Sequence, residues 1–542
     1  MFLSHSLPEH NPYLGSIRKH LPDSMWVELT DEEKWYNVFY EEVTTQINEE
    51  LFAPLYSEVG RPNSPIYLLV AMLILKSGKN WTDKELFENI SYHMLCMVAL
   101  GLEITDEKPC DKTYYTFKVR LELYKQETGI DLLKDCFQDL TAGQAARYGV
   151  QGKKIRTDGK QFSSNVAQSN RLELVISVTQ KFYTNLSEQD KELLKISDQL
   201  LLEGLVNKTA ANHSYGLSKS EKTEWLNALG ALLHRLVKLF DSQSLPEFDL
   251  IERLFSEQFK ITEEQVELKK KTEISGKTLQ TAHDTDAKYI KKGSGKTQQI
   301  DIGFGANLTE TIDNIPQEES PESITSCEQA QKPLRLITDV EVFGIEKGEK
   351  ECLVPGITNT EKITKHSVEE VSSDGNYHCP QNVQAIEQLN EQENRKQAIE
   401  WHVAAMQGTL PIFDFEWVED GQLKVTIIAT GVSQIAKRMS TTYRITLADG
   451  TYRYIYPKQV TNYFIRKKIE DQPPEVRNRR ANVEATVGHV FATLSGNNGR
   501  KTKYRGLFRN SCFVINRCCW VNYRRIMRYR KRKSENSLKQ VA

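Results

Sequence analysis

The segment at residues 153–165 reads KKIRTDGKQFSSN, and the chain changes there from helical to β character. The pattern predicts a short strand from Lys154 to Thr157, ended by Asp158 and Gly159, where a polar turn begins. A carboxylate that ends a strand beside a glycine is accessible while its backbone stays on a rigid scaffold. Asp158 is therefore the first candidate site residue.

Toward the N-terminus, residues 1–145 are expected to be helical. Thr82 and Glu85 have the spacing of a capping box, and apolar residues follow at helical intervals up to Gly101, which suits a helix end. A second helix is expected over DKTYYTFKVRLELYKQETG, from Asp111 onward. Two such helices suit a small DNA-reading bundle, but they suit any other helical domain equally.

Toward the C-terminus, helical and β segments alternate. Residues 170–268 carry apolar side chains at the spacing of packed helices, and β character begins at about Asp284. A later strand ends in an Asp-Gly turn at Asp374 and leads into a helix, whereas residues 314–332 are expected to form an exposed polar loop. Two Asp-Gly hairpins are expected between residues 410 and 465.

The last part of the chain is expected to return to helix after two adjacent prolines, and Glu484 lies inside that helix. From Ala485 to Ser534 there is no acidic residue, whereas Lys and Arg are frequent and tyrosines are interleaved with them. A segment of this kind is either a DNA-binding surface or a solvated face. The formal net charge of −2 does not reveal this basic segment, because the middle of the chain is acidic.

Composition limits the class of protein. A hydrophobic fraction of 39% over 542 residues is enough for several packed cores. No apolar run approaches the roughly 20 residues that a membrane-spanning helix needs. The nine cysteines lack the spacing of a disulfide framework or a zinc site, which favours free thiols in a reducing cytoplasm.

Three carboxylates suit one particular chemistry. Cleavage of phosphodiester bonds by two metal ions needs carboxylates that converge on cations about 4 Å apart. Magnesium prefers oxygen ligands and keeps some of its waters, so a few carboxylates are enough. The candidates are Asp158 and Asp374 at strand ends and Glu484 on a late helix. Asp339 is the rival for the second acid, but no turn follows it, which favours Asp374.

Four segments resemble those of insertion-sequence transposases with an RNase H-like core, in that family's order. KKIRTDGKQFSSN resembles the segment of the first aspartate, and HDTDAKYIKKGSGKTQ resembles the one that follows it in a large group of these enzymes. SSDGNYHCPQN resembles the segment of the second aspartate, and RRANVEATVGHVF resembles that of the glutamate. At the front, RPNSPIYLLVAMLILKSGKNWTDKELFENI is similar to their N-terminal helical domain.

The resemblance implies a mixed α/β fold: an RNase H-like mixed sheet flanked by helices, with an N-terminal helical domain, a helical insertion and a β-hairpin insertion. It implies a DDE transposase of a bacterial insertion sequence, in which Asp158, Asp374 and Glu484 are the catalytic residues and bind Mg²⁺ or Mn²⁺. Such an enzyme hydrolyses phosphodiester bonds at the ends of the element and then joins those ends to target DNA. The implied partners are double-stranded DNA, as terminal inverted repeats and target, and further copies of the chain. No membrane is implied, and the expected location is the bacterial cytoplasm, at the nucleoid.

The resemblance also implies DNA-binding cations near the glutamate. They are Arg477, Arg480, Arg500, Lys501, Lys503 and Arg505. Arg480 shares a helix face with Glu484 and either forms an ion pair with it or holds a phosphate. The sequence departs from the family at two places, because relatives often carry tyrosine in place of Arg477 and lysine in place of Phe491. These departures bear on end recognition more than on catalysis.

The pattern predicts a division into six parts. They are 1–145, an N-terminal helical domain for DNA-end binding; 146–169, the first part of the catalytic core; 170–275, a helical insertion; 276–400, the core continued; 401–472, a β insertion; and 473–542, the helix of Glu484 with the basic tail. Two other functions stay open. One is a DNA-binding protein descended from a transposase that no longer cuts, and the other is a nuclease with the same core that acts on RNA.

Overall fold

The computed structural model describes residues 1–541 apart from positions 6, 8, 9, 242, 244, 264 and 394 and the segments 294–297, 313–332, 404–410, 419–420, 474–483 and 496–498. The expected polar loop at 314–332 and the candidates Arg477 and Arg480 lie outside the described residues. Within these residues the predicted mixed α/β fold is confirmed, with a helical N-terminal region, a mixed sheet and small antiparallel sheets.

The N-terminal region is helical, as predicted. Its helices are α1 (Pro12–Ile17), α2 (Asp23–Leu29), α3 (Trp35–Glu42), α4 (Ile66–Lys79), α5 (Asp83–Tyr92), α6 (Met94–Leu100), α7 (Asp111–Thr128) and α8 (Leu132–Arg147), with 3₁₀ turns η1 (Arg18–His20), η2 (Thr44–Gln46) and η3 (Glu49–Leu55). Thr82 and Glu85 form both hydrogen bonds of a capping box at the start of α5. The helix does not continue unbroken to Gly101, because the extended backbone of His93 divides it into α5 and α6.

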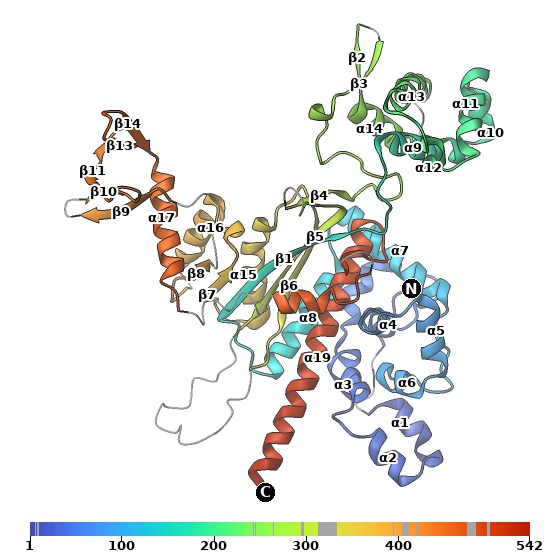
Figure 1. Cartoon of the computed structure of the whole chain (residues 1–542). Coiled ribbons are helices and arrows are strands. Elements are labelled where there is room, and N and C mark those ends of the chain that lie inside the picture. The colour runs from blue at the N-terminus through green and yellow to red at the C-terminus, as the bar shows by residue number, and fades with distance from the viewer. Residues whose placement is uncertain are drawn as a thin grey trace.

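A six-stranded mixed sheet forms the centre of the molecule (Figure 1). Its strands are β1 (Lys154–Ser163), β4 (Lys288–Lys292), β5 (Gln299–Thr311), β6 (Ile337–Gly344), β7 (Glu370–Ser373) and β8 (Glu400–Val403). They follow the order β4-β5-β1-β7-β8, and β6 also pairs with β5. β1 is antiparallel to β5 and parallel to β7, which is parallel to β8.

β1 is longer than the sequence predicts. The expected turn at Asp158 and Gly159 is wrong, because both residues continue the strand and pair with Leu308 and Asn307 of β5. Gly159 marks a close approach instead, since a Cβ there would lie 2.7 Å from the Cδ of Glu349. Asp158 therefore lies in the middle of a strand and not at its end.

Helices cover both faces of the sheet. The elements concerned are η7 (Glu349–Cys352), α15 (Leu353–Thr364), η8 (Gly375–Tyr377), α16 (Pro380–Asn390), a helix at 484–490 and α19 (Leu507–Val541). On one face, α15 and α16 bury a core that includes Ile155 and Val371. On the other, residues 484–490 and α19 join the large core of the N-terminal region. Trp520 of α19 lies so close to Gly78 of α4 that a Cβ at Gly78 would overlap the indole ring.

Two further units flank the sheet, and each has a core of its own. The first contains α9 (Arg171–Asn185), α10 (Glu188–Glu192), α11 (Ile196–Val206), α12 (Ala210–Ser214), α13 (Lys219–Phe240), α14 (Phe248–Gln258), β2 (Phe259–Thr262), β3 (Gln265–Leu268) and a 3₁₀ turn η4 (Lys271–Glu273). The second contains β9 (Phe413–Val418), β10 (Gln422–Ile427), β11 (Ser433–Ile435), β12 (Lys437–Arg438), β13 (Tyr443–Thr446), β14 (Tyr452–Ile455) and α17 (Pro457–Glu470). Figure 1 shows the two units projecting from the sheet on different sides.

Both predicted hairpins of the second unit are confirmed in their strand pairing, and positions 419 and 420 of the first turn lie outside the described residues. β9 pairs antiparallel with β10, and β13 pairs antiparallel with β14. In the described part of the chain, no helix combines the length and the apolar character that crossing a membrane requires.

Candidate active site

Asp158 lies in β1, and Asp374 directly follows the neighbouring strand β7. The last paired residues of β1 and β7 are Arg156 and Ser372, and each aspartate follows its strand's residue of that pair by two positions. Because side chains alternate along a strand, both aspartates project from the face that Arg156 occupies. Neighbouring strands lie about 4.8 Å apart, so from this register we expect the two carboxylates to lie near each other.

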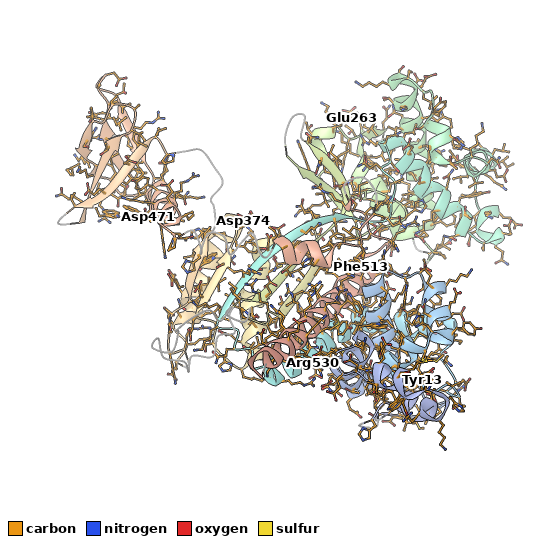
Figure 2. The ribbon with its side chains drawn as sticks, turned by 60° about the horizontal axis from the view of Figure 1, so that its bottom comes forward. Tyr13, Glu263, Asp374, Asp471, Phe513 and Arg530 are labelled. Carbon is orange, nitrogen blue, oxygen red and sulfur yellow. The ribbon has the colours of Figure 1, made fainter. Side chains whose placement is uncertain are left out.

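Asp374 follows the end of β7, as the sequence predicts. Its backbone stays extended, with φ −73° and ψ 159°, and it caps the 3₁₀ turn η8. The amide of Gly375 donates a hydrogen bond of 2.6 Å to its Oδ1. Both Asp374 and Asp158 are half-buried. Figure 2 shows Asp374 in the central part of the molecule, between Asp471 after α17 and Phe513 of α19 in that view.

A buried polar group on the opposite face of the sheet fixes β1 against the turn after β7. The Asn307 amide donates a hydrogen bond of 2.9 Å to the hydroxyl of Thr157. The hydroxyl of Tyr377 in turn donates to the Oδ1 of Asn307. Burial raises the pKa of Tyr377 well above its ordinary value, so its hydroxyl remains a donor. This chain of bonds connects the residue before Asp158 to the turn that Asp374 caps.

The helical segment 484–490 is held on the sheet by a buried charged network. Glu310 of β5 accepts a hydrogen bond of 2.5 Å from the Nε of Arg156 and one of 2.8 Å from the hydroxyl of Thr486. Arg525 of α19 forms an ion pair of 2.8 Å with the same carboxylate. Burial raises the pKa of Glu310, but Arg525, Arg156 and Thr486 outweigh it, so the pKa is lowered and the carboxylate stays charged. The network places this segment on the face of the two aspartates.

Glu484 begins that segment, and its side chain is exposed. Phe491 directly follows the helix, and its amide still donates to the carbonyl of Val487. Residues seven positions apart lie on one side of a helix, so this geometry puts Phe491 on the side of Glu484. The Phe491 ring packs on Phe162 of β1 with centroids 5.3 Å apart, and the Nζ of Lys160 lies 5.3 Å from the centre of the same ring. Asp158, Lys160 and Phe162 occupy every second position of β1, so all three side chains project from one face of the sheet.

The strand pairing assigns Asp158 and Asp374 to one face of the sheet, and the helix that begins at Glu484 packs on that same face. Asp158 lies in β1 and Asp374 directly follows the neighbouring β7, whereas Glu484 begins the helical segment 484–490, in which Thr486 contacts Glu310 of β5. Among the described residues, no three His, Cys, Asp or Glu side chains form a group that could hold a metal ion. Magnesium is usually bound by one or two carboxylates together with waters and substrate phosphates, without a complete protein cage. The two aspartates fit such an ion in donor chemistry and in their shared level on the sheet.

Asp339, the rival for the second acid, lies elsewhere. It pairs with Thr309, whose hydroxyl contacts that of Thr157, so it belongs to the face opposite Asp158. Its side chain is fully buried and contacts the Nζ of Lys134 at 3.3 Å. Burial raises the pKa of Asp339. A buried carboxylate in an ion pair on the wrong face suits a structural role.

The four DNA-binding candidates within the described residues border the loop that leaves β1. The Nζ of Lys501 donates to the carbonyl of Val166, and the Nε of Arg505 donates to that of Asn165, both at 2.8 Å. The Nζ of Lys503 donates to the carbonyl of Asn80 at 3.3 Å. The guanidinium of Arg500 lies 3.6 Å from the carboxylate of Asp301. Lys503 and Arg505 are exposed, whereas Arg500 and Lys501 are half-buried. Lysine has three N–H donors and arginine has five, so these bonds leave Lys503 and Arg505 with further donors.

The basic C-terminal segment is partly structural. Arg517 is buried and donates to the carbonyls of His489 and Val490 at 2.7 and 2.9 Å. Arg530 forms an ion pair of 2.7 Å with Glu41 of α3. The sequence pattern alone therefore overstates the free positive charge of this segment, since Arg525 is also engaged with the sheet.

Lys160 is a candidate that the expected turn at Asp158 obscured. Lys160 lies two positions after Asp158, so the two side chains share a face of the sheet if the strand continues through Gly159. The structure shows that it does. A cation therefore lies on the same face as the two aspartates.

A family model for a transposase domain (DUF772) matches residues 27–120. The match covers α3 to α6 and the first half of α7, and it ends before the sheet begins. Neither the comparison with curated proteins nor that with solved structures finds a match.

Proposed function

We propose that this protein is a DDE transposase that cuts DNA at the ends of a mobile element and joins those ends to target DNA. The observation that supports the proposal is the register of β1 and β7, from which we expect Asp158 and Asp374 to lie level on the face where the helix of Glu484 packs. The transposase-domain match at residues 27–120 supports it independently.

The sheet supports an RNase H-like core. The strands β6, β5 and β1 are antiparallel neighbours, and β7 and β8 continue the sheet parallel to β1. In chain order β1 is the first strand of this set and β7 the fourth. The resemblance assigns the first two acids to those two strands and the third to a late helix.

Asp158, Asp374 and Glu484 would hold two Mg²⁺ ions, and Mn²⁺ could take their place. When bound, the ions lower the pKa of the attacking water or 3′-hydroxyl and stabilise the leaving oxygen. Each step breaks one phosphorus–oxygen bond and forms another, and the leaving 3′-oxygen takes up a proton. Lys160 would hold a non-bridging phosphate oxygen beside Asp158, because its ammonium lies on that face over Phe491.

Cleavage of labelled DNA tests the proposal. The full chain is incubated with a duplex that carries the DNA flanking its coding region, with Mg²⁺, with Mn²⁺ or with a chelator. We expect cutting at defined positions with either metal and none with the chelator. Binding without cutting in both metals would favour a DNA-binding protein that no longer cuts, and cutting of RNA alone would favour an RNA nuclease.

DNA affinity should depend on salt through the cations beside the β1 loop. Each phosphate neutralised by Lys or Arg contributes about 0.9 to the slope of log affinity against log salt. We expect the double variant Lys503→Gln/Arg505→Gln to lower that slope by about two, measured by fluorescence anisotropy from low to high salt. The control is Lys208→Gln/Lys219→Gln, which removes two exposed charges from the α9–α14 unit. Equal slopes in both double variants would reject the assignment.

A further inference from the structure

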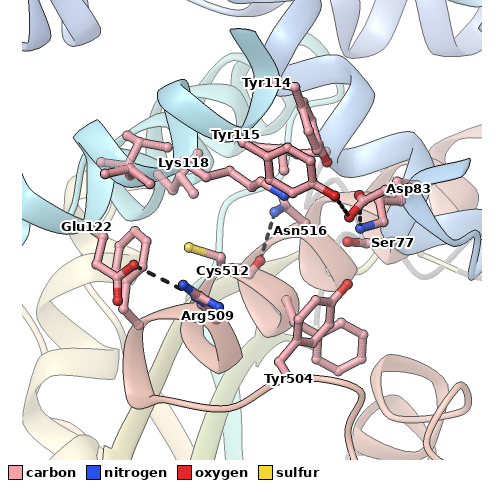
Figure 3. Close-up of a pocket in the computed structure, with 17 residues that line it drawn as sticks. Ser77, Asp83, Tyr114, Tyr115, Lys118, Glu122, Tyr504, Arg509, Cys512 and Asn516 are labelled. Carbon is pink, nitrogen blue, oxygen red and sulfur yellow. Dashed lines mark hydrogen bonds and ion pairs between the residues drawn. The ribbon is translucent and has the colours of Figure 1, made fainter. Parts of the chain in front are cut away.

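A cavity of about 220 Å³ lies between the N-terminal helices and the start of α19 (Figure 3). Tyr114, Tyr115 and Lys118 of α7 line one side, and Arg509 and Phe508 of α19 line another. Most of its wall is apolar or aromatic. It is separate from the acids on the sheet, because none of those acids lines it.

Two polar groups of the cavity, one of them fully buried, have no hydrogen-bond or ion-pair partner among the described residues. Tyr114 is fully buried, and its hydroxyl has no hydrogen-bond partner among the described residues. The ammonium of Lys118 lies 4.3 and 4.1 Å from the ring centres of Tyr114 and Tyr115, and it forms no ion pair in the described part of the chain. Burial lowers the pKa of Lys118 to about 8. Buried hydroxyls are normally satisfied, so the unmet hydroxyl of Tyr114 indicates a missing ligand, and the half-buried ammonium of Lys118 supplies a charge in the same cavity.

The end of the cavity already has its charges paired. Lys76 of α4 contacts Asp83 of α5 at 2.5 Å, and the hydroxyl of Tyr115 donates to the other Asp83 oxygen at 2.7 Å. Both carboxylate oxygens of Asp83 are therefore already bonded within the protein. Arg509 lies 3.8 Å from Glu122 and is largely exposed, so its guanidinium can turn to a ligand at the mouth.

We infer that this cavity binds a single nucleotide, with the base between the aromatic side chains and the phosphate at Lys118 and Arg509. The volume suits one planar ring system and excludes a duplex. The hydroxyl of Tyr114 can both donate and accept, which matches the polar edge of a base. Stacking on aromatic side chains accepts any base because every base has a π face. The nucleotide comes either from solution or from an unpaired position of bound DNA, and the second source rests on the proposed function.

Titration of the full chain with deoxyadenosine monophosphate tests the binding site directly. We expect calorimetric binding by the wild type, and affinity weakened about tenfold in Lys118→Gln, because a charge-assisted bond to phosphate is lost. Tyr114→Phe, which removes one oxygen atom, should weaken binding several-fold. Lys112→Gln is the matched control, since Lys112 is exposed on the first turn of the same helix and outside the cavity.

The source of the nucleotide is tested with two duplexes that differ only in one unpaired terminal 2-aminopurine. If DNA supplies the nucleotide, the wild type should prefer the overhang about tenfold and change its fluorescence, and Tyr114→Phe should lose part of that preference. Binding of the free nucleotide without an overhang preference supports the site with solution as the source. No binding in either experiment, or unchanged affinities in both cavity variants, overturns the inference. Because neither readout requires cleavage, failure of the proposed catalysis leaves these outcomes distinguishable.

Discussion

The Asp374→Asn variant should lose at least about a thousandfold in the rate of DNA cleavage, with DNA binding retained. The substitution removes the negative charge that would bind a metal ion, and metal ions supply several kcal/mol of transition-state stabilisation, at 1.36 kcal/mol for each factor of ten in rate. The local fold should survive, because the amide oxygen of asparagine can still accept the 2.6 Å hydrogen bond from Gly375. Single-turnover cleavage of end-labelled duplex measures the rate, and anisotropy measures binding.

Asp339→Asn is the matched control for this loss. It exchanges the same two residue types on the opposite face of the sheet, where burial already raises the pKa of the carboxyl. We expect it to cut at a rate near that of the wild type once the folded fraction is taken into account. If Asp374→Asn cuts normally and Asp339→Asn does not, the second acid has been misassigned. Asp158→Asn and Glu484→Gln should match Asp374→Asn.

Glu310→Ala should destabilise the sheet by about 3–5 kcal/mol, because it leaves buried charge without a partner. Arg156 is 1% exposed and bonds to Glu310, as do Arg525 and the hydroxyl of Thr486. The helix that carries Glu484 should loosen with it. Hydrogen exchange of the β1 and β5 amides, read by mass spectrometry, gives the free energy of opening at this place.

The control for this prediction is a surface ion pair. Glu369→Ala removes the partner of Lys153, a pair of 3.1 Å in which both side chains are about a quarter exposed, and should cost less than about 1 kcal/mol. The effect of Glu310→Ala should also depend on pH. Because the folded protein lowers the pKa of Glu310, its contribution is complete above the unfolded value of about 4.3 and is lost as pH falls through the folded value. A difference that persists unchanged well below pH 4 would contradict the assigned cause.

The parts of the fold that sequence predicts well are those with local signals. Thr82 and Glu85 are three residues apart, and the Asp-Gly hairpins of β9–β10 and β13–β14 span a few residues each. Asp158-Gly159 carries the same dipeptide signal, but the turn that it predicts is wrong. There the long pairing with β5, whose partner residues lie about 150 positions away, outweighs the local preference for a turn.

The candidate site divides in the same way. Motifs predict the three acids, and their assignment stays a prediction. What sequence could not supply is their arrangement, which depends on the β1–β7 register and on a network joining Arg156, Glu310 and Arg525. The face of Asp339 also follows only from the pairing of β5 with β6. The Tyr114 cavity was unpredictable, because its walls come from opposite ends of the chain.

The surface of α4 that contains Gly78 is covered by Trp520 of α19, and α19 is synthesised last. A ribosome adds about 5–20 residues each second, so the α4 surface waits for tens of seconds before α19 has been made. During that interval the apolar side chains that α19 later covers remain open to chaperones and proteases. A message that ended before α19 would yield a protein with this core uncovered. We therefore expect shortened products of this gene to be degraded rapidly, so that only chains carrying α19 accumulate.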